Sequence, residues 1–401
     1  MGDKQLVKEK EYMETQEVDP AELITRQAII DRDKNSFGYE LLYQNSPDKF
    51  IPLLASNHKT AQALLNRFAS LPADKEIEKG RKPVFINMDC QFLLIDALPA
   101  LLFPAIIIEL NPEAADHVEN LLAYKNRHPQ LKLCLGSFRA DIYPEELLKI
   151  ADYISIDLQS FPADAINTFK PLGSSFSGLI KVKNIQTADD FKHALMLDAD
   201  LFSGEFLIAP ELSEAKMLSA NAQATLRLLG ELYNPDTNPE KIERAIIADT
   251  ILTTQLLRLI NSAAFGMARK IENIKEAIVF LGLSMLRQWV SLLVLSSQKN
   301  KPSELMRINL VRAAFCRDLA QLLETVDADK AFLMGLISMI DAYLDFPLKN
   351  LLDDLPLSDD INQALLSESG ILGDILSSVR HYEQADWPNL GQQQLAEAVW
   401  G

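Results

Sequence analysis

Acidic and amide side chains follow or interrupt several short apolar runs in the first half of the chain. These residues are Glu40, Asn87, Asp89, Glu109 and Asp157. A carboxylate rarely lies within an apolar strand unless another group pairs with it. Oxygen ligands that come from several strands suit Mg²⁺ or Mn²⁺. The pattern therefore indicates either the metal-binding face of a hydrolase or the remains of one.

The apolar runs around these residues alternate with segments of helical period. Two strands, at 26–31 and 37–43, are expected to flank a polar turn, and six further runs follow at 83–88, 105–110, 131–136, 153–158, 178–183 and 200–206. Helical segments are expected at 56–71, 112–128 and 186–198. This alternation predicts a parallel sheet that is buried on both sides. We expect an α/β fold, a TIM-like (β/α) barrel whose strand carboxyl ends meet at one face. An open doubly wound sheet is the alternative, but no GxGxxG follows the first strand.

The second half of the chain has a different period. From Leu226 onward the apolar residues recur at helical spacing, and no strand signal of comparable length follows. Gly282 interrupts the longest apolar segment and predicts a break between two helices. We therefore expect a tail at 1–22, a barrel domain at 23–208, a linker at 209–222 and an all-helical domain at 223–401.

Composition and charge exclude some functions. The chain has 401 residues, of which 48% are hydrophobic and 24% charged, and its formal net charge is −17. Such a charge argues against nucleic acid as a partner, because binding phosphates needs a basic surface. Three widely spaced cysteines fit reduced thiols better than a disulfide framework. No secretion signal is visible, and the most apolar stretch, 277–297, is interrupted by Arg287 and Gln288. We expect a cytoplasmic protein without membrane insertion.

The first half resembles the EAL domain, a barrel family whose active members hydrolyse cyclic di-GMP with two metal ions. The resemblance covers about residues 23–210 and follows from YELLY, VFINMDCQFL and IIIEL, in that order. It implies that Glu40, Asn87 and Glu109 correspond to the metal ligands of the family.

The chain departs from the family at several other positions. Active members carry two aspartates, a lysine, two glutamates and a glutamine, and the positions that differ here are Gly136, Ser137, Ser155, Lys183, Gln186 and Ser203. Asp157 is retained. A two-metal site needs clustered anionic ligands to hold its ions and activate a water. The resemblance therefore implies vestigial positions at Glu40, Asn87, Glu109 and Asp157, with Glu40 satisfied by hydrogen bonds or by a cation such as Lys183.

The helical half resembles the HDOD family, which is related to HD phosphohydrolases but lacks their metal site. The motif residues are Asp249, Asn261, Ser262 and Gly282, in the stretch 244–295. HD-type hydrolysis needs several histidines and aspartates around its metals. His381 is the only histidine after residue 209. Asn261 and Ser262 are interpreted as the carboxyl end of a helix, because both residue types favour turns.

We interpret the chain as a bacterial signalling regulator that acts through protein–protein contacts and is not an enzyme. We expect no cofactor, no metal and no turnover, and we do not expect cyclic di-GMP to be a partner. The partner proteins are unknown, and a homodimer is an open alternative. Two further alternatives remain. One is a receptor that holds cyclic di-GMP through Arg139 and Lys183, and the other is a residual phosphodiesterase that uses Glu40, Asn87, Glu109 and Asp157.

Overall fold

The computed structural model describes most of the chain in two compact units. The described residues are 24–43, 82–88, 90, 93, 105–160, 176–211, 218, 220–234, 236–262, 269–296, 301–324 and 326–390. The first unit comprises residues 1–206 and 380–401, and the second comprises 207–379. The sequence instead places 380–401 with the helical domain. The expected tail at 1–22, the helix at 56–71 and Asp89 lie outside the described residues.

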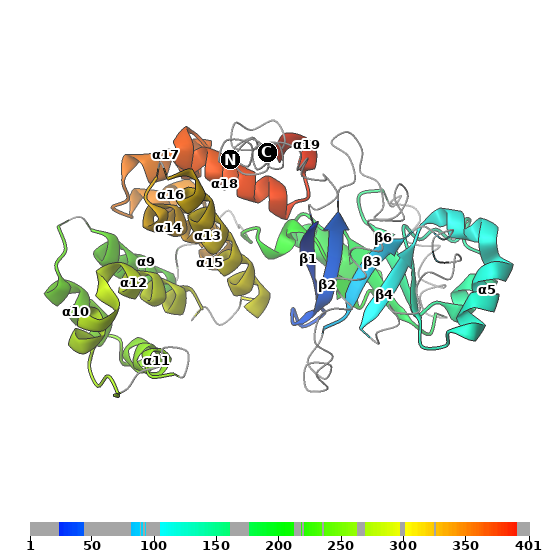
Figure 1. Cartoon of the computed structure of the whole chain (residues 1–401), viewed down its shortest axis with the longest axis horizontal. Helices are drawn as coiled ribbons and strands as arrows, with labels where there is room; N and C mark the ends of the chain where they lie inside the picture. The colour runs from blue at the N-terminus through cyan, green and yellow to red at the C-terminus, as the bar shows by residue number, and fades with distance from the viewer. Residues whose placement is uncertain are drawn as a thin grey trace, which may run out of the picture. The chain divides into compact units, whose positions relative to one another are not determined.

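Eight strands close into a barrel in the first unit (Figure 1). The strands are β1 (Ile24–Asp31), β2 (Ser36–Tyr43), β3 (Val84–Met88), β4 (Ile106–Leu110), β5 (Lys132–Leu135), β6 (Tyr153–Asp157), β7 (Leu179–Lys183) and β8 (Leu201–Phe202). Each expected strand is present, and the barrel prediction is confirmed. Strands β2 to β8 pair in parallel, while β1 is antiparallel to both β2 and β8.

The first two strands form a hairpin because Asp31 fixes the turn between them. Its carboxylate accepts hydrogen bonds from the backbone N–H of Asp33, at 2.9 Å, and of Asn35, at 2.8 Å. An aspartate that bonds the backbone two residues further on favours a turn over a continued strand. The turn lets β2 run parallel to β3, which brings Glu40 to the same barrel face as the carboxyl ends of the later strands.

Helices connect the parallel strands. The connecting elements are η3 (Pro112–His117), α5 (Val118–Arg127), α6 (Glu145–Ile150) and α8 (Ala188–Met196), and η4 (Glu205–Leu207) follows the last strand. Helix α8 begins with a capping box, in which Thr187 and Asp190 each accept a hydrogen bond from the other's backbone N–H. Inside the barrel, an apolar layer contains Ile29, Phe85, Ile107, Cys134 and Leu201, with Phe37 and Tyr153 packed against it.

The second unit is helical throughout its described residues, as the sequence predicts. Its helices are α9 (Ala220–Tyr233), α10 (Pro239–Ile247), α11 (Thr250–Ile260), α12 (Ile274–Ser296), α13 (Ser303–Leu323), α14 (Ala328–Ile337), α15 (Ile340–Leu344), α16 (Leu348–Asp353) and α17 (Asp359–Ser367). Helix α18 (Gly370–Glu383) begins in this unit, and α19 (Trp387–Leu390) belongs to the first. Helices α10 and α12 each contact α9 and α11 as well as each other, and α13 packs on α14.

Two helices of this unit show how glycine shapes the packing. A Cβ atom on Gly335 of α14 would lie 2.8 Å from Ala313 Cα, so this glycine permits the close approach of α13. Gly282 has φ 75° and ψ 165°, which breaks α12 where the sequence predicts a break. Helix α12 is also the one described helix whose length and hydropathy would allow a membrane span.

Candidate functional site: an ion network at the barrel mouth

Four charged side chains and one amide meet inside the barrel, near the carboxyl ends of its parallel strands. They are Glu40 on β2, Asn87 on β3, Glu109 on β4, and Lys181 and Lys183 on β7. Side chains alternate along a strand, so Lys181 and Lys183 lie on the same face of β7. The register pairs Asn87 with Glu109 and places Glu40 beside Phe85. These five side chains form a polar layer, in which Glu40, Glu109 and Lys181 are the register partners of Phe85, Cys134 and Leu201 of the apolar layer.

Lys181 is at the centre of the network. Its Nζ donates to Glu40 Oε2 at 2.9 Å and to Glu109 Oε2 at 2.5 Å. The ammonium also lies 4.5 Å from the centroid of the Phe85 ring. The side chains of Lys181 and Glu109 are fully buried, and that of Glu40 is 3% exposed. A buried ammonium is tolerated only when it is paired, and here two carboxylates pair with it.

The second oxygen of each carboxylate has its own partner. Asn87 Nδ2 donates to Glu40 Oε1 at 2.9 Å, and Lys183 Nζ donates to Glu109 Oε1 at 3.1 Å. The Cys134 thiol lies 3.8 Å from Glu109 Oε2. All four carboxylate oxygens are therefore hydrogen-bonded, and the two glutamates balance the two lysines in formal charge.

The network shifts the pKa values of its members. Burial by itself would raise the pKa of Glu109, but the charges of Lys181 and Lys183 lower that pKa to about 2. Burial would lower the pKa of Lys181, but Glu109 and Glu40 raise it well above its usual value. Glu109 also raises the pKa of Lys183. Burial, followed by the charge of Glu109, raises the pKa of the Cys134 thiol. The glutamate and the lysines are thus held in their charged forms at neutral pH.

Among the described residues, two buried serine hydroxyls on or after the neighbouring strands have no hydrogen-bond partner. Ser155 is the register partner of Lys181 on the neighbouring strand β6, and Ser203 follows β8. Both residues are fully buried, and both Oγ atoms are unsatisfied. A buried polar atom without a partner is uncommon, so the polar layer retains two unused donors.

Other predicted site residues take part in local structure instead. Asp157 accepts from Asn184 Nδ2 at 2.9 Å and from the Gln159 backbone at 3.1 Å. Gln186 donates its backbone N–H to Asp190. Arg139 forms an exposed pair with Asp141 at 2.7 Å. Among their described contacts, none joins these residues to Glu40 or Glu109.

Gly136 lies against the network without contributing a side chain to it. A Cβ atom at this position would lie 3.0 Å from Glu109 Cγ and 2.9 Å from the carbonyl oxygen of Leu110. Ser137, next in sequence, adopts φ 45°. A larger residue at Gly136 would therefore have to displace Glu109 or the backbone of β4.

Lys181 is not among the residues predicted from the sequence. Glu40 is expected to be satisfied by hydrogen bonds or by a cation such as Lys183, and in the structure Asn87 and Lys181 donate to it. The cation on Glu40 is Lys181, whereas Lys183 bonds Glu109. A signal was available in GLIKVK, because two lysines at alternate positions of a buried strand point the same way. The sequence does not show, however, which of the other strands they reach.

The donor set does not fit a divalent metal ion. Such ions take several carboxylate, carbonyl or water oxygens, yet the oxygens of Glu40 and Glu109 are bonded to ammonium and amide groups. Among the described residues, no group of three or more His, Cys, Asp or Glu side chains is placed to hold a metal. No catalytic step through a metal follows from this geometry.

The motif residues of the helical unit stabilise helix ends. Asp249 caps α11 by accepting from the backbone N–H groups of Ile251 and Leu252. At the other end, Asn261 Nδ2 donates to the carbonyls of Leu257 and Ile271, and its Oδ1 accepts from Ile271 N, each at 2.8 Å. The backbone N–H of Ser262 donates to Leu259 O. Asn261 is thus the carboxyl-terminal cap of α11 and joins that helix end to Ile271.

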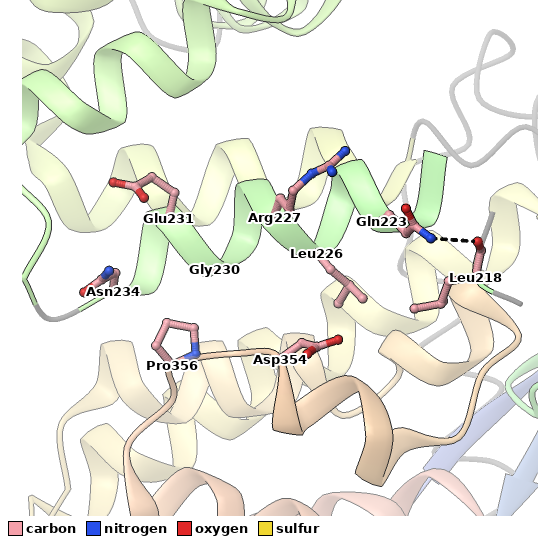
Figure 2. A pocket seen from close by; sticks show the side chains of 9 residues that line it. All are labelled: Leu218, Gln223, Leu226, Arg227, Gly230, Glu231, Asn234, Asp354 and Pro356. Carbon is pink, nitrogen blue, oxygen red and sulfur yellow. Dashed lines mark hydrogen bonds between the residues drawn. The ribbon is translucent and has the colours of Figure 1, made fainter. Parts of the chain in front are cut away.

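A hollow of about 530 Å³ lies beside α9 in the helical unit. Figure 2 shows its lining residues, which are Leu218, Gln223, Leu226, Arg227, Gly230, Glu231, Asn234, Asp354 and Pro356. Gln223 donates to the carbonyl of Leu218, and Glu231 accepts from Thr237. Its charged side chains form no described pair with one another, so the hollow lacks the converging charges seen in the barrel.

Comparisons with known proteins identify the helical region. Residues 218–343 match the HDOD domain model, so an HDOD domain is present. The chain is 28% identical to the cyclic di-GMP phosphodiesterase CdgJ of Vibrio cholerae over 376 residues, which cover 92% of this chain and 86% of that protein.

Solved structures that contain EAL domains are similar to part of this chain. The FimX EAL domain is 16% identical to this chain, and the match has a TM-score of 0.37. The match covers 49% of this chain and 92% of the FimX chain. The Bacillus subtilis YkuI protein, with an EAL domain, in complex with substrate c-di-GMP and calcium, is 13% identical with a TM-score of 0.35. This match covers 68% of this chain and 73% of the YkuI chain. At this level of similarity, neither structure bears on the chemistry of the chain.

Two expectations from the sequence are wrong in view of these comparisons. The Vibrio cholerae relative, which matches over nearly the whole chain, is named as an enzyme, and this contradicts the expectation that the chain is not one. The same name contradicts the expectation that cyclic di-GMP is not a partner. Both expectations were based on the loss of individual motif residues. That loss does not show which groups the closed barrel brings together in place of the missing ones.

Proposed function

We propose that the chain acts on cyclic di-GMP, and that the dinucleotide binds at the barrel mouth beside the ion network. The relative's name supports this ligand, and its match extends over 92% of the chain. The observation that carries the proposal is Lys183, whose side chain is 17% exposed while its ammonium bonds the fully buried Glu109. It is thus a cation at the border between the barrel interior and solvent.

The charge balance of the network favours an anionic ligand. The chain as a whole carries −17, which repels the phosphates of a dinucleotide. At the mouth, however, Lys181 and Lys183 cancel the charges of Glu40 and Glu109. An ammonium has three donors, and Lys183 uses one of them on Glu109 in the described contacts. The remaining donors are available for a phosphate oxygen.

Hydrolysis of a phosphodiester bond is the reaction that the relative's name supports. The described side chains account for binding and for charge neutralisation. Glu109, whose pKa is about 2, is too weak a base to take a proton at neutral pH. The attacking water therefore needs activation by a group other than Glu109.

Calorimetric titration of cyclic di-GMP into the full chain tests the proposal, with EDTA and again with Mn²⁺, followed by a search for linear product. We expect binding in the wild type, and about tenfold or more weaker binding in Lys183→Met, because a charge-assisted hydrogen bond is lost. Lys192→Met is the control, since Lys192 pairs with Asp189 on an exposed helix face. Absence of binding, or equal binding by Lys183→Met, would overturn the proposed site. Binding without product would leave a receptor in place of a phosphodiesterase.

A role in protein contacts is a second candidate, and one observation favours it. Helix α12 exposes 83% of Val279 and 46% of Phe280, and α11 exposes 71% of Ile251. Large apolar groups on contacting helices are typical of protein interaction sites. Sedimentation of the wild type and of Val279→Asp over a concentration series tests for self-association. Identical monomeric behaviour of both proteins would exclude a homodimer through this face.

A further inference from the structure

The barrel supplies its own cation. Lys181 Nζ lies 2.9 Å from Glu40 Oε2 and 2.5 Å from Glu109 Oε2, and so joins carboxylates from two different strands. Joining anionic oxygens from separate strands is the structural task of a bound metal ion in such a layer. We propose that the ammonium of Lys181 takes the place of a divalent cation, and that its removal converts Glu40, Asn87 and Glu109 into a divalent-cation site.

The ammonium of Lys181 is a permanent part of the site, because it is covalently attached to the chain. Lys181 is anchored on β7 between its pairings with Ser155 and Leu201, and its side chain has no exposure to solvent. A dissolved cation competes with this ammonium only by displacing a buried charge that remains attached to the chain. Displacement would leave that charge unpaired in a region of low dielectric constant, which is strongly unfavourable.

All four carboxylate oxygens of the network are already hydrogen-bonded in the wild type. Glu40 Oε1 accepts from Asn87, and Glu109 Oε1 accepts from Lys183. The remaining two oxygens, Glu40 Oε2 and Glu109 Oε2, are the pair bonded to Lys181. Replacement of Lys181 by a neutral side chain frees these two oxygens and changes the formal charge of the network from zero to −1.

Oxygen donors and buried hydroxyls would surround a cation in the variant. Asn87 can rotate its amide to offer an oxygen, which gives three oxygen donors from β2, β3 and β4. The two unsatisfied hydroxyls, Ser155 and Ser203, are buried, and Ser155 is the register partner of the replaced residue. Hydroxyls of this kind can bond the waters that complete the shell of Mn²⁺.

Mn²⁺ binding to metal-free protein tests the inference directly, by loss of the electron paramagnetic resonance signal of the free ion. The proteins are the wild type, Lys181→Met and the double variant Lys181→Met/Glu109→Gln. Lys192→Met serves as the surface control. We expect Lys181→Met to bind one Mn²⁺ per chain at least about tenfold more tightly than the wild type. We also expect Mn²⁺ to raise the melting temperature of that variant only.

Two results would overturn the inference. One is Mn²⁺ binding by the wild type that Glu40→Gln abolishes, because the carboxylates would then accept a metal with Lys181 in place. The other is Mn²⁺ binding by Lys181→Met that is no tighter than that of the wild type or that survives in the double variant. If Lys181→Met does not fold, Lys181→Gln keeps a polar group of similar reach and takes its place. The comparison of the wild type with Glu40→Gln can overturn the inference without either Lys181 variant.

The readout uses the metal alone, without any dinucleotide. Failure of cyclic di-GMP to bind would remove the proposed function and leave this inference intact. Conversely, Mn²⁺-dependent hydrolysis by the wild type through Glu40 would support the proposed function and overturn the cation replacement.

Discussion

Ser155 and Lys181 are register partners on adjacent parallel strands, β6 and β7. The ammonium of Lys181 donates hydrogen bonds to Glu40 and Glu109, while the buried hydroxyl of Ser155 has no hydrogen-bond partner among the described residues. A lysine at position 155 is what the resemblance to active EAL domains implies, and the chain carries serine there. The structure places a lysine one strand further along, at the same level of the barrel.

Ser155→Ala should leave the barrel as stable as the wild type, or stabilise it by up to about 1 kcal/mol. The substitution removes a buried hydroxyl whose desolvation is not compensated by a hydrogen bond. Urea unfolding, followed by circular dichroism, measures the difference. Ser338→Ala is the matched control, because the buried hydroxyl of Ser338 donates to Gly335 O at 2.7 Å. The control should lose about 1–3 kcal/mol, and equal losses in both variants would show that Ser155 has a partner.

Glu109→Gln should destabilise the barrel by about 3–5 kcal/mol. The substitution leaves Lys183 without its carboxylate and Lys181 with Glu40 alone, so a buried cation is only partly compensated. The exchange rates of the backbone amides in β4 and β7 measure this loss of stability locally. Glu119→Gln, on the exposed face of α5, should have no measurable effect. Unchanged exchange in Glu109→Gln would contradict the buried ion network.

Acid should weaken the same strands between about pH 4.5 and pH 2. The pKa of Glu109 falls from its usual 4.5 to about 2 in the folded state, so protons bind more readily to the unfolded chain. The resulting stabilisation is complete above the unfolded pKa and disappears as the pH falls through the folded one. It is on the order of 3 kcal/mol. Exchange rates of β4 amides from pH 5 to pH 2 measure it, and Glu109→Gln should lack this part of the pH dependence.

Gly136→Ala should disturb the network although residue 136 has no side chain in it. Its Cβ would lie 3.0 Å from Glu109 Cγ and 2.9 Å from Leu110 O, so β4 or Glu109 must move. Overpacking of this kind costs about 1–3 kcal/mol. Gly230→Ala in α9 is the control, because its nearest contact is 3.7 Å away and alanine favours a helix. Thermal unfolding should separate the two, with the Gly230 variant as stable as the wild type or more so.

Asn261→Ala should destabilise the helical unit by about 1–3 kcal/mol. The amide bonds both the carbonyl and the N–H of Ile271 and also the carbonyl of Leu257, so its loss leaves three backbone groups without this partner. Gln255→Ala on the exposed face of α11 is the control. Urea unfolding monitored by tryptophan fluorescence reports on this unit through Trp289 when Trp387 and Trp400, which belong to the first unit, are replaced by phenylalanine in all proteins compared. A loss as small as that of the control would show that Asn261 does not join the two segments.

The elements of this fold could be predicted because their periods are strong. Each Ile-rich run reads as a strand buried on both faces, and the later helices have apolar stripes at helical spacing. Glu40, Asn87 and Glu109 were identified because polar residues are conspicuous in such runs. Lys181 was missed because only residues at strand ends were considered. Which strands its ammonium joins depends on the curvature of the closed barrel, and no local pattern encodes that distance.

Gly282 divides α12, the most apolar helix, into two shorter arms. At about 1.5 Å of rise per residue, the segment Ile274–Leu281 before the break extends about 12 Å, and Leu283–Ser296 after it extends about 21 Å. A hydrocarbon core is about 30 Å thick. With φ 75° at the junction, the two arms do not share one helix axis. The helix therefore has the composition of a membrane span, but neither arm alone is as long as the hydrocarbon core is thick. Each arm presents apolar surface over a length that a neighbouring helix can cover.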